Sequence, residues 1–157
     1  MNTNANATNN FLSINSDVLN ELTVWLWNGI NYVAINQAST SQFAAPAQGF
    51  FVKSKPEGGQ VSFTELMQSH QSENFLKSSS SRPEIKVYAS KGNVKKSSDI
   101  FYIENTTTGF DNGYDSTLYS GNSSNFEVFT KLANGDNKMN FSIQSIPLDF
   151  SLIIPIG

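Results

Sequence analysis

The chain has 157 residues, of which 38% are hydrophobic and 15% are charged, and its net charge is −3. This length fits one domain with a buried core. The small net charge argues against nucleic-acid binding. The absence of cysteine excludes disulfides and thiolate metal sites. No apolar stretch approaches the roughly 18 residues of a membrane helix, so membrane insertion is not expected. Composition alone points to no function.

The first part of the chain predicts a polar segment followed by a hairpin. Residues 1–17 are rich in Asn, Thr and Ser, and we expect a flexible segment there, ahead of a module over 18–157. The stretches LTVWLW (22–27) and NYVAIN (31–36) flank an Asn-Gly pair, which is a strong short-range hairpin signal. These two stretches are therefore predicted to be antiparallel strands.

The next part of the chain predicts two further strands and one helical turn. GFFVKS (49–54) is aromatic and β-branched, so we expect a strand with Phe50 and Val52 facing the core. QVSFT (60–64) alternates as a strand does, and ELMQSHQSENFL (65–76) has room for one helical turn.

The second half of the chain is dominated by short strand patterns separated by turn residues. A second hairpin is expected around a Gly-Asn turn, and three later strands follow. The predicted strands are 84–90, 98–104, 125–131, 139–146 and 149–156. About nine short strands, with at most one short helix, are typical of an all-β, antiparallel two-sheet sandwich that resembles a jelly roll.

Trp25 and Trp27 are the most conspicuous aromatic residues. They lie two positions apart, so they share one face of a strand, and Tyr32 can join them across the hairpin. One interpretation is that this face packs under a loop or the second sheet. Another is a flat aromatic platform for sugar rings, and a third is contact with a partner protein, because exposed aromatic patches mark interaction sites.

The turn GFDNGYDS (109–116) carries a cluster of oxygen donors. Asp111, Asn112 and Asp115 are the hard ligands that Ca²⁺ prefers, although their spacing is not that of an EF-hand. The same residue types are common in turns for conformational reasons. No cofactor is therefore expected, with calcium as the alternative.

The sequence offers few catalytic groups. His70 is the only histidine and sits in a polar segment without a glycine-framed nucleophile. No pair of carboxylates stands in a recognisable glycosidase setting. We therefore expect no enzymatic activity and no catalytic residues.

Five segments occur in an order that resembles a known module. They are VWLWNGINYVAIN, APAQGFFVKSK, SFTELMQSHQSENFLK, NTTTGFDNGYDSTLYSG and MNFSIQSIPLDF. Together they resemble a β-sandwich module of large secreted Bacteroidetes proteins, usually found ahead of the carboxy-terminal sorting domain of the type IX secretion system. The resemblance covers roughly residues 20–155. The Asn-Pro-Tyr-Pro motif of that family and the sorting domain are absent here.

The resemblance implies export to the cell surface and no catalytic activity. It also makes Ser116 a candidate for O-glycosylation, because Asp115-Ser116-Thr117 is similar to the acceptor sequence of that phylum. The apolar run at 152–157 adds the expectation that the chain is truncated at both ends and contacts neighbouring domains of a larger polypeptide.

These observations predict a non-catalytic module of a secreted or cell-surface protein, with a structural spacer or adhesion role. The alternative is a carbohydrate-binding module that uses Trp25, Trp27 and Tyr32 against a polysaccharide or surface glycan. A calcium-stabilised adhesin repeat is the third hypothesis.

Overall fold

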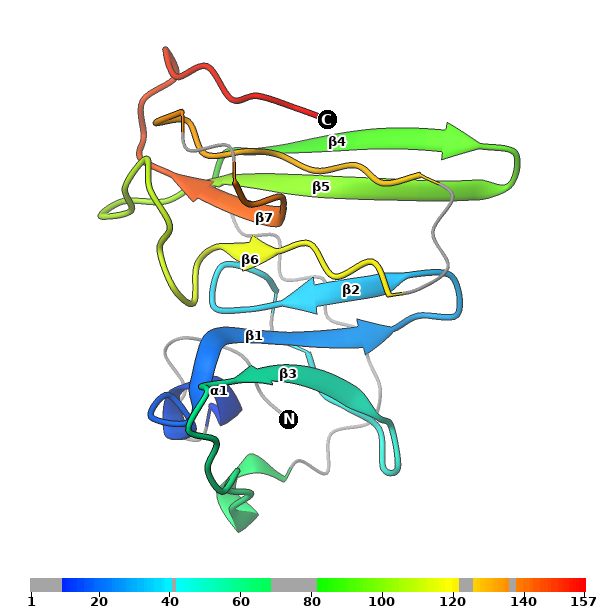
Figure 1. Cartoon of the computed structure of the whole chain (residues 1–157), viewed down its shortest axis with the longest axis vertical. Coiled ribbons are helices and arrows are strands. Elements are labelled where there is room, and N and C mark those ends of the chain that lie inside the picture. Colours follow the sequence, from blue (N-terminus) through cyan, green and yellow to red (C-terminus); the bar gives the residue numbers. More distant parts are fainter. Residues whose placement is uncertain (1–9, 41, 69–81, 122–125, 136–137) are drawn as a thin grey trace.

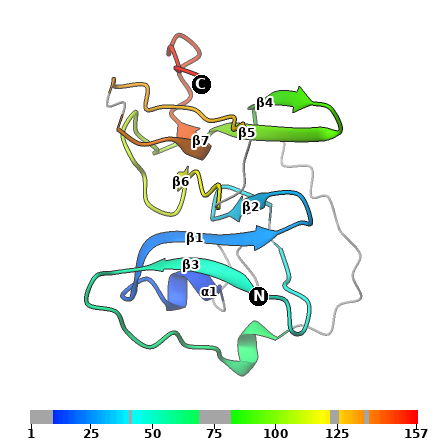
Figure 2. The same ribbon diagram turned by 45° about the vertical axis from the view of Figure 1, so that its right-hand side comes forward.

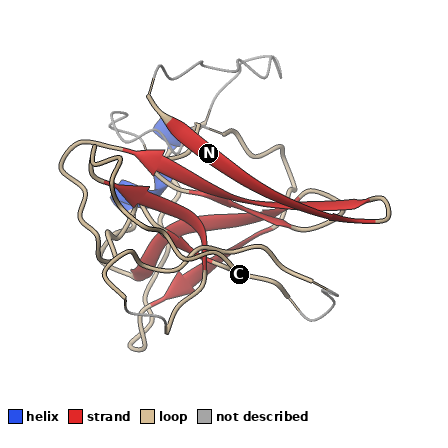
Figure 3. Cartoon of the chain, turned by 90° about the horizontal axis from the view of Figure 1, so that it is seen from above, coloured by secondary structure: helices blue, strands red, loops and turns tan. Residues whose placement is uncertain are grey.

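The computed structural model describes residues 10–40, 42–68, 82–121, 126–135 and 138–157. These residues form an all-β fold with two sheets, and the helical segments are short (Figure 3). From the top of Figure 1 downward lie the C-terminal segment, a four-stranded sheet, a three-stranded sheet and a single turn of α-helix. Figure 2 shows the same succession from another side. The expectation of an all-β, two-sheet protein with at most one short helix is confirmed for the described residues, although the α-helix lies at Phe11–Ile14, where a polar segment was expected.

The three-stranded sheet has the order β2-β1-β3. Its strands are β1 (Leu19–Trp27), β2 (Tyr32–Ile35) and β3 (Phe50–Ser54). Both pairs are antiparallel. The predicted first hairpin is confirmed: the side-chain oxygen of Asn28 accepts hydrogen bonds from the N–H groups of Ile30 and Asn31, and Gly29 takes a positive φ of 98°.

The four-stranded sheet has the order β4-β5-β7-β6. Its strands are β4 (Glu84–Lys91), β5 (Val94–Tyr102), β6 (Ser116–Thr117) and β7 (Phe141–Ile146). The second predicted hairpin is also confirmed, and Gly92 in its turn has a φ of 61°.

The prediction of a wholly antiparallel fold was wrong at one place, because β5 and β7 run parallel. Parallel neighbours need a long crossover connection. The chain between Tyr102 and Phe141 provides it and places β6 on the far side of β7.

Three apolar clusters follow the succession of layers. The cluster between α1 (Phe11–Ile14) and the three-stranded sheet contains Phe11, Leu12, Leu19, Val24 and Met67. The cluster between the two sheets contains Trp25, Ala34, Ala38, Phe101 and Ile143. The cluster under the C-terminal segment contains Ile100, Tyr102 and Ile146, with Leu152 and Ile154 packed against it.

Phe50 and Val52 pack against the first of these clusters, as predicted, while Phe51 lies on the other face of β3 and is 48% exposed. The two faces of β3 therefore have different roles: one contributes to the core and the other reaches the surface.

Three predicted strands are not strands in the structure: 60–64, 149–156 and the described part of 125–131. In the first, the backbone of Ser62 pairs with the side chain of Asn15, through N–H···Oδ1 at 2.6 Å and Nδ2–H···O at 3.1 Å. The amide side chain of Asn15 accepts from the N–H and donates to the carbonyl of Ser62, so these two backbone groups have hydrogen-bond partners without a neighbouring strand.

The other two form only isolated bridges. Phe129 and Gly157 exchange two backbone hydrogen bonds of 3.0 Å, and Thr130 bridges both Phe141 and Ile156. Pro155 has no N–H group, so a regular ladder cannot extend along this segment.

Part of the expected polar N-terminal segment is packed into the core. Asn10 caps α1 by accepting a hydrogen bond from the Leu12 N–H at 2.9 Å, and Phe11 and Leu12 are fully buried. Residues 10–12 thus pack against the module predicted over 18–157, and the domain boundary itself stays a prediction. Within the predicted helical region, Glu65–Met67 form a 3-10 turn, and residues 69–76 lie outside the described residues. No helix among the described residues has the length and apolarity to cross a bilayer.

Candidate functional site

Four aromatic rings meet on the surface at one end of the three-stranded sheet. We call Trp27, Tyr32, Phe51 and Tyr119 the aromatic platform. The centroid of Tyr32 lies 5.0 Å from that of Trp27, 5.3 Å from Phe51 and 4.8 Å from Tyr119. Phe51 and Tyr119 are stacked at 5.4 Å. Tyr32 is therefore the centre of a continuous aromatic surface.

Strand register places three of these rings together. Trp27 lies opposite Tyr32 in the β1–β2 hairpin, and Phe51 lies opposite Trp25 in the β1–β3 pair. Facing partners in a sheet lie on the same side, so their side chains converge. The predicted contact between Trp27 and Tyr32 is thus confirmed.

Tyr119 reaches the platform from the loop after β6. Hydrogen bonding between the Leu118 N–H and the Asn140 carbonyl, at 2.8 Å, holds this loop against the start of β7. Gly121 then passes close to Tyr32: a Cβ atom there would lie 3.0 Å from the ring, and its φ is 61°. A glycine allows both the conformation and the close approach.

Three rings of the platform, those of Trp27, Tyr32 and Phe51, line an open groove of about 720 Å³ together with Gln48 and Gly49. Trp27 and Phe51 are each 48% exposed, and Tyr119 is 38% exposed. These three rings are therefore accessible to solvent although the rings of the platform pack against one another.

Trp25 does not belong to this accessible surface. It is 3% exposed, and its indole N–H donates to the Thr117 carbonyl at 3.2 Å. Trp25 forms part of the core between the sheets and supports Tyr119 from below, at a centroid distance of 6.0 Å. Of the three residues proposed from the sequence, two reach the site and one lies beneath it.

The three calcium candidates each form hydrogen bonds with backbone groups. Asp111 accepts a hydrogen bond from the Thr107 N–H at 2.6 Å. The oxygen of Asn112 accepts from the Leu22 N–H at 2.8 Å, and its amide donates to the Asn20 carbonyl at 3.3 Å. These contacts fasten the turn to itself and to the edge of β1.

Asp115 is fully buried and receives two short hydrogen bonds. Its Oδ2 accepts from the Asp111 N–H at 2.7 Å, and its Oδ1 accepts from the Ser145 N–H at 2.6 Å. Burial raises the pKa of Asp115 to about 7, because the loss of hydration outweighs the stabilisation that these two N–H groups give to the charged form. Asp115 thus connects the turn to β7 from inside the protein.

A calcium ion needs several oxygen ligands that converge on one point. Among the described residues, no group of three or more acidic or histidine side chains is placed to hold a metal ion. A cation at this turn would have to share oxygens of Asp111, Asn112 and Asp115 that already accept backbone hydrogen bonds.

Ser116, the glycosylation candidate, is fully buried in β6. Its hydroxyl lies 3.3 Å from the Thr117 carbonyl and 3.5 Å from the hydroxyl of Ser142. The folded protein does not present this hydroxyl at its surface, so modification would have to precede folding.

Sequence reasoning missed a second buried carboxylate, Glu21. It is 2% exposed, and its two oxygens accept from the N–H and hydroxyl of Thr117 at 2.6 and 2.7 Å. The ammonium of Lys53 lies 3.7 Å away. Glu21 directly precedes the predicted strand LTVWLW (22–27), and no local pattern marked it as buried. The register shifts on either side of Glu21 turn it toward the second sheet.

His70 lies outside the described residues. The fold and the site define an all-β protein of two sheets with an exposed aromatic surface. Comparison with protein-family models, with curated proteins and with solved structures found no match for this chain.

Proposed function

We propose that this protein is a non-catalytic adhesion module that binds carbohydrate through its aromatic platform. The observation that carries the proposal is that Trp27 and Phe51, each 48% exposed, line an open groove, while the exposed ring of Tyr119 packs against Phe51. Soluble proteins rarely expose contiguous apolar surface unless it binds something. Flat aromatic faces suit the apolar C–H faces of pyranose rings, and the neighbouring Gln48 adds a polar group that suits hydroxyls.

The cellular setting of this proposal is the surface or exterior of a bacterium. It rests on the five ordered sequence segments that resemble a secreted Bacteroidetes module. In the same proposal the two sheets form a sandwich of the jelly-roll type, and the covalent neighbours are other domains of a larger polypeptide.

A glycan array probed with the whole protein tests this function. We expect binding to a set of polysaccharides, and we expect Trp27→Ala to weaken it by about tenfold or more, as for an exposed aromatic hot spot. Tyr88→Ala is the matched control, because Tyr88 is 52% exposed on β4, in the other sheet. Equal binding by all three proteins, or no binding at all, would refute the proposal.

A specific observation also favours a spacer role. Several apolar side chains near the C-terminal end are exposed, namely Leu148, Phe150, Ile153 and Ile156. This surface suits contact with a neighbouring domain. Hydrogen exchange across 148–156, measured in the chain alone and with its native flanking sequence, would test it: protection only in the longer chain supports the spacer role.

A further inference from the structure

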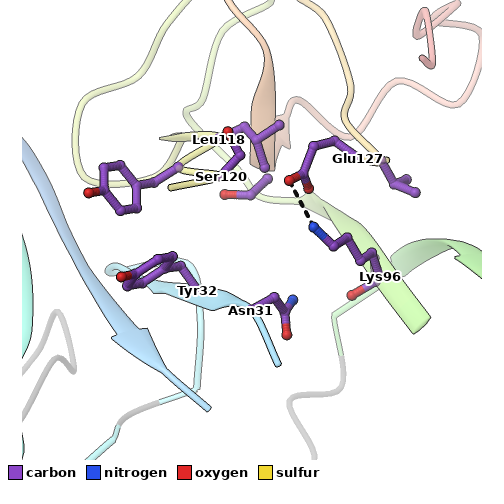
Figure 4. Close-up of a pocket in the computed structure, with 10 residues that line it drawn as sticks. Asn31, Tyr32, Lys96, Leu118, Ser120 and Glu127 are labelled. Carbon is purple, nitrogen blue, oxygen red and sulfur yellow. Dashed lines mark hydrogen bonds and ion pairs between the residues drawn. The ribbon is translucent and has the colours of Figure 1, made fainter. Parts of the chain in front are cut away.

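A small polar pocket lies beside the aromatic platform. Tyr32 and Tyr119 line it, so it shares two rings with the platform. On its other side Lys96 and Glu127 form an ion pair of 2.8 Å, and Figure 4 shows this pair facing Tyr32 across the pocket. The pocket is therefore next to any ligand that rests on Tyr32.

The ion pair is largely removed from solvent. The Lys96 side chain is 10% exposed and the Glu127 side chain 20%. Because the two charges lie in hydrogen-bond contact, they cancel, and the pocket carries no net charge from them. It nevertheless keeps hydrogen-bonding capacity, since a carboxylate offers about four lone-pair positions, and the bond from Lys96 to Oε1 of Glu127 occupies one of them.

The remaining polar lining also suits hydroxyl groups. Asn31 brings a carbonyl oxygen and an amide, and Ser120 brings a hydroxyl; both line the same pocket. Each of these groups can donate and accept. A ligand hydroxyl, which also does both, fits such a lining better than a carboxylate, which only accepts hydrogen bonds and would find the charge of Lys96 already paired with Glu127.

The size of the pocket limits what enters it. Its volume is about 20 Å³, and a single water needs about 10–15 Å³ measured in this way. This space matches a group of about the size of one hydroxyl carried on a single carbon.

We propose that this pocket is a subsite for the hydroxymethyl group of a neutral hexopyranose whose ring stacks on the platform at Tyr32. This inference rests on the proposed carbohydrate binding and assigns its substrate class. Pentoses lack the hydroxymethyl group, and uronic acids carry a carboxylate in its place, so both are weaker ligands for this site.

Matched tetrasaccharides provide the first test, by titration calorimetry on the whole protein. The hexose probes have gluco, manno or galacto configuration, xylotetraose is the pentose counterpart, and an oligogalacturonide is the acidic one. We expect at least one hexose probe to bind about tenfold more tightly than xylotetraose, as is usual when a pocket loses one group it is built for. Equal affinity for hexose and pentose probes would overturn the subsite while leaving carbohydrate binding intact.

Two variants separate the pocket from the platform. Ser120 is exposed at the pocket, so Ser120→Leu fills the space without touching the core. It should remove the hexose preference and keep the affinity for xylotetraose. Glu127→Gln leaves the charge of Lys96 uncompensated, and it should raise affinity for the oligogalacturonide relative to the hexose probe.

Trp27→Ala is the third variant. It should lower the affinity for hexose and pentose probes by the same factor, because it removes a ring of the platform and leaves the pocket intact. Unchanged melting temperatures show that each variant is folded; if Glu127→Gln lowers its melting temperature, Ser120→Leu alone decides. A hexose preference that survives Ser120→Leu would overturn the proposal, and so would absence of binding to every probe, which would also refute the proposed function.

Discussion

The turn at 109–116 and the aromatic platform distribute their side chains in opposite ways. In the turn, the polar residues Asp115 and Ser116 are fully buried, and Asp115 accepts hydrogen bonds from two backbone N–H groups. On the platform, large aromatic residues point outward, with Trp27 and Phe51 each 48% exposed. Each region thus reverses the usual partition of polar and apolar residues.

The difference teaches which exposed or buried groups call for a functional explanation. Buried polar groups that satisfy backbone donors are explained by the architecture, since unpaired N–H groups inside a protein are costly. Exposed aromatic groups receive no such explanation from the fold. We therefore assign the turn to stability and the platform to binding.

The largest expected effect concerns the two tryptophans of β1. Trp25→Ala should lower the free energy of unfolding by about 3–5 kcal/mol, because it empties a core position. Trp27→Ala should change it by less than about 1 kcal/mol, since surface substitutions have small effects. Urea unfolding of both variants checks this, and comparable losses would contradict the separation of platform from core.

A smaller loss is expected when the buried carboxylate of the turn is removed. Asp115→Ala leaves two N–H groups, those of Asp111 and Ser145, without an acceptor, and each unsatisfied buried donor costs about 1–3 kcal/mol. The control is Asp111→Ala. The hydrogen bond that this variant removes, from the Thr107 N–H to Asp111, is exposed, so water can replace the lost acceptor. Similar stability for the two variants would show that the turn does not depend on its buried residue.

The pH dependence of stability should carry the signature of Asp115. Its pKa is about 7 in the folded protein against an ordinary value of 3.8, so the folded state retains a proton that the unfolded state has released. The contribution is fully present below about pH 4 and is lost as the pH rises to about 7, with a slope of at most ~1.4 kcal/mol per unit.

Burial also raises the pKa of Asp99, which adds to the slope in the same direction. Chemical unfolding of the wild type and of Asp115→Asn over this range isolates the part that belongs to Asp115. Parallel curves for the two proteins would contradict the assignment.

The smallest expected effect is that of calcium. Since the described residues contain no group of three or more acidic or histidine side chains placed to hold a metal ion, excess calcium and excess chelator should give the same melting temperature. A ligand that binds only the native state would raise it with concentration. A calcium-dependent rise that Asp111→Ala abolishes would restore the calcium hypothesis.

Local patterns predicted much of the fold. The Asn-Gly and Gly-Asn turns located both hairpins, and alternation placed Phe50 and Val52 in the core. What the sequence did not reveal were long-range partners: the parallel pairing of β5 with β7, and the pairing of Ser62 with the side chain of Asn15 in place of a strand. Such contacts depend on the whole topology and leave no periodic signal.

The candidate site was predicted in part for the same reason. Trp27 and Tyr32 meet through hairpin register, which the sequence specifies. Tyr119, Phe51 and the Lys96–Glu127 pair arrive from distant segments, so no local pattern joins them. Trp25 shows the limit of alternation: it shares a face with Trp27, yet the second sheet covers one and leaves the other exposed.

Binding of the strongest glycan on the array to Trp27→Phe and Trp27→Ala, beside the wild type, tests the central claim most directly. Our account predicts that Trp27→Phe keeps most of the affinity, because a flat ring remains, while Trp27→Ala loses about tenfold or more at an unchanged melting temperature. Equal affinity of all three proteins would show that the platform is not the binding surface.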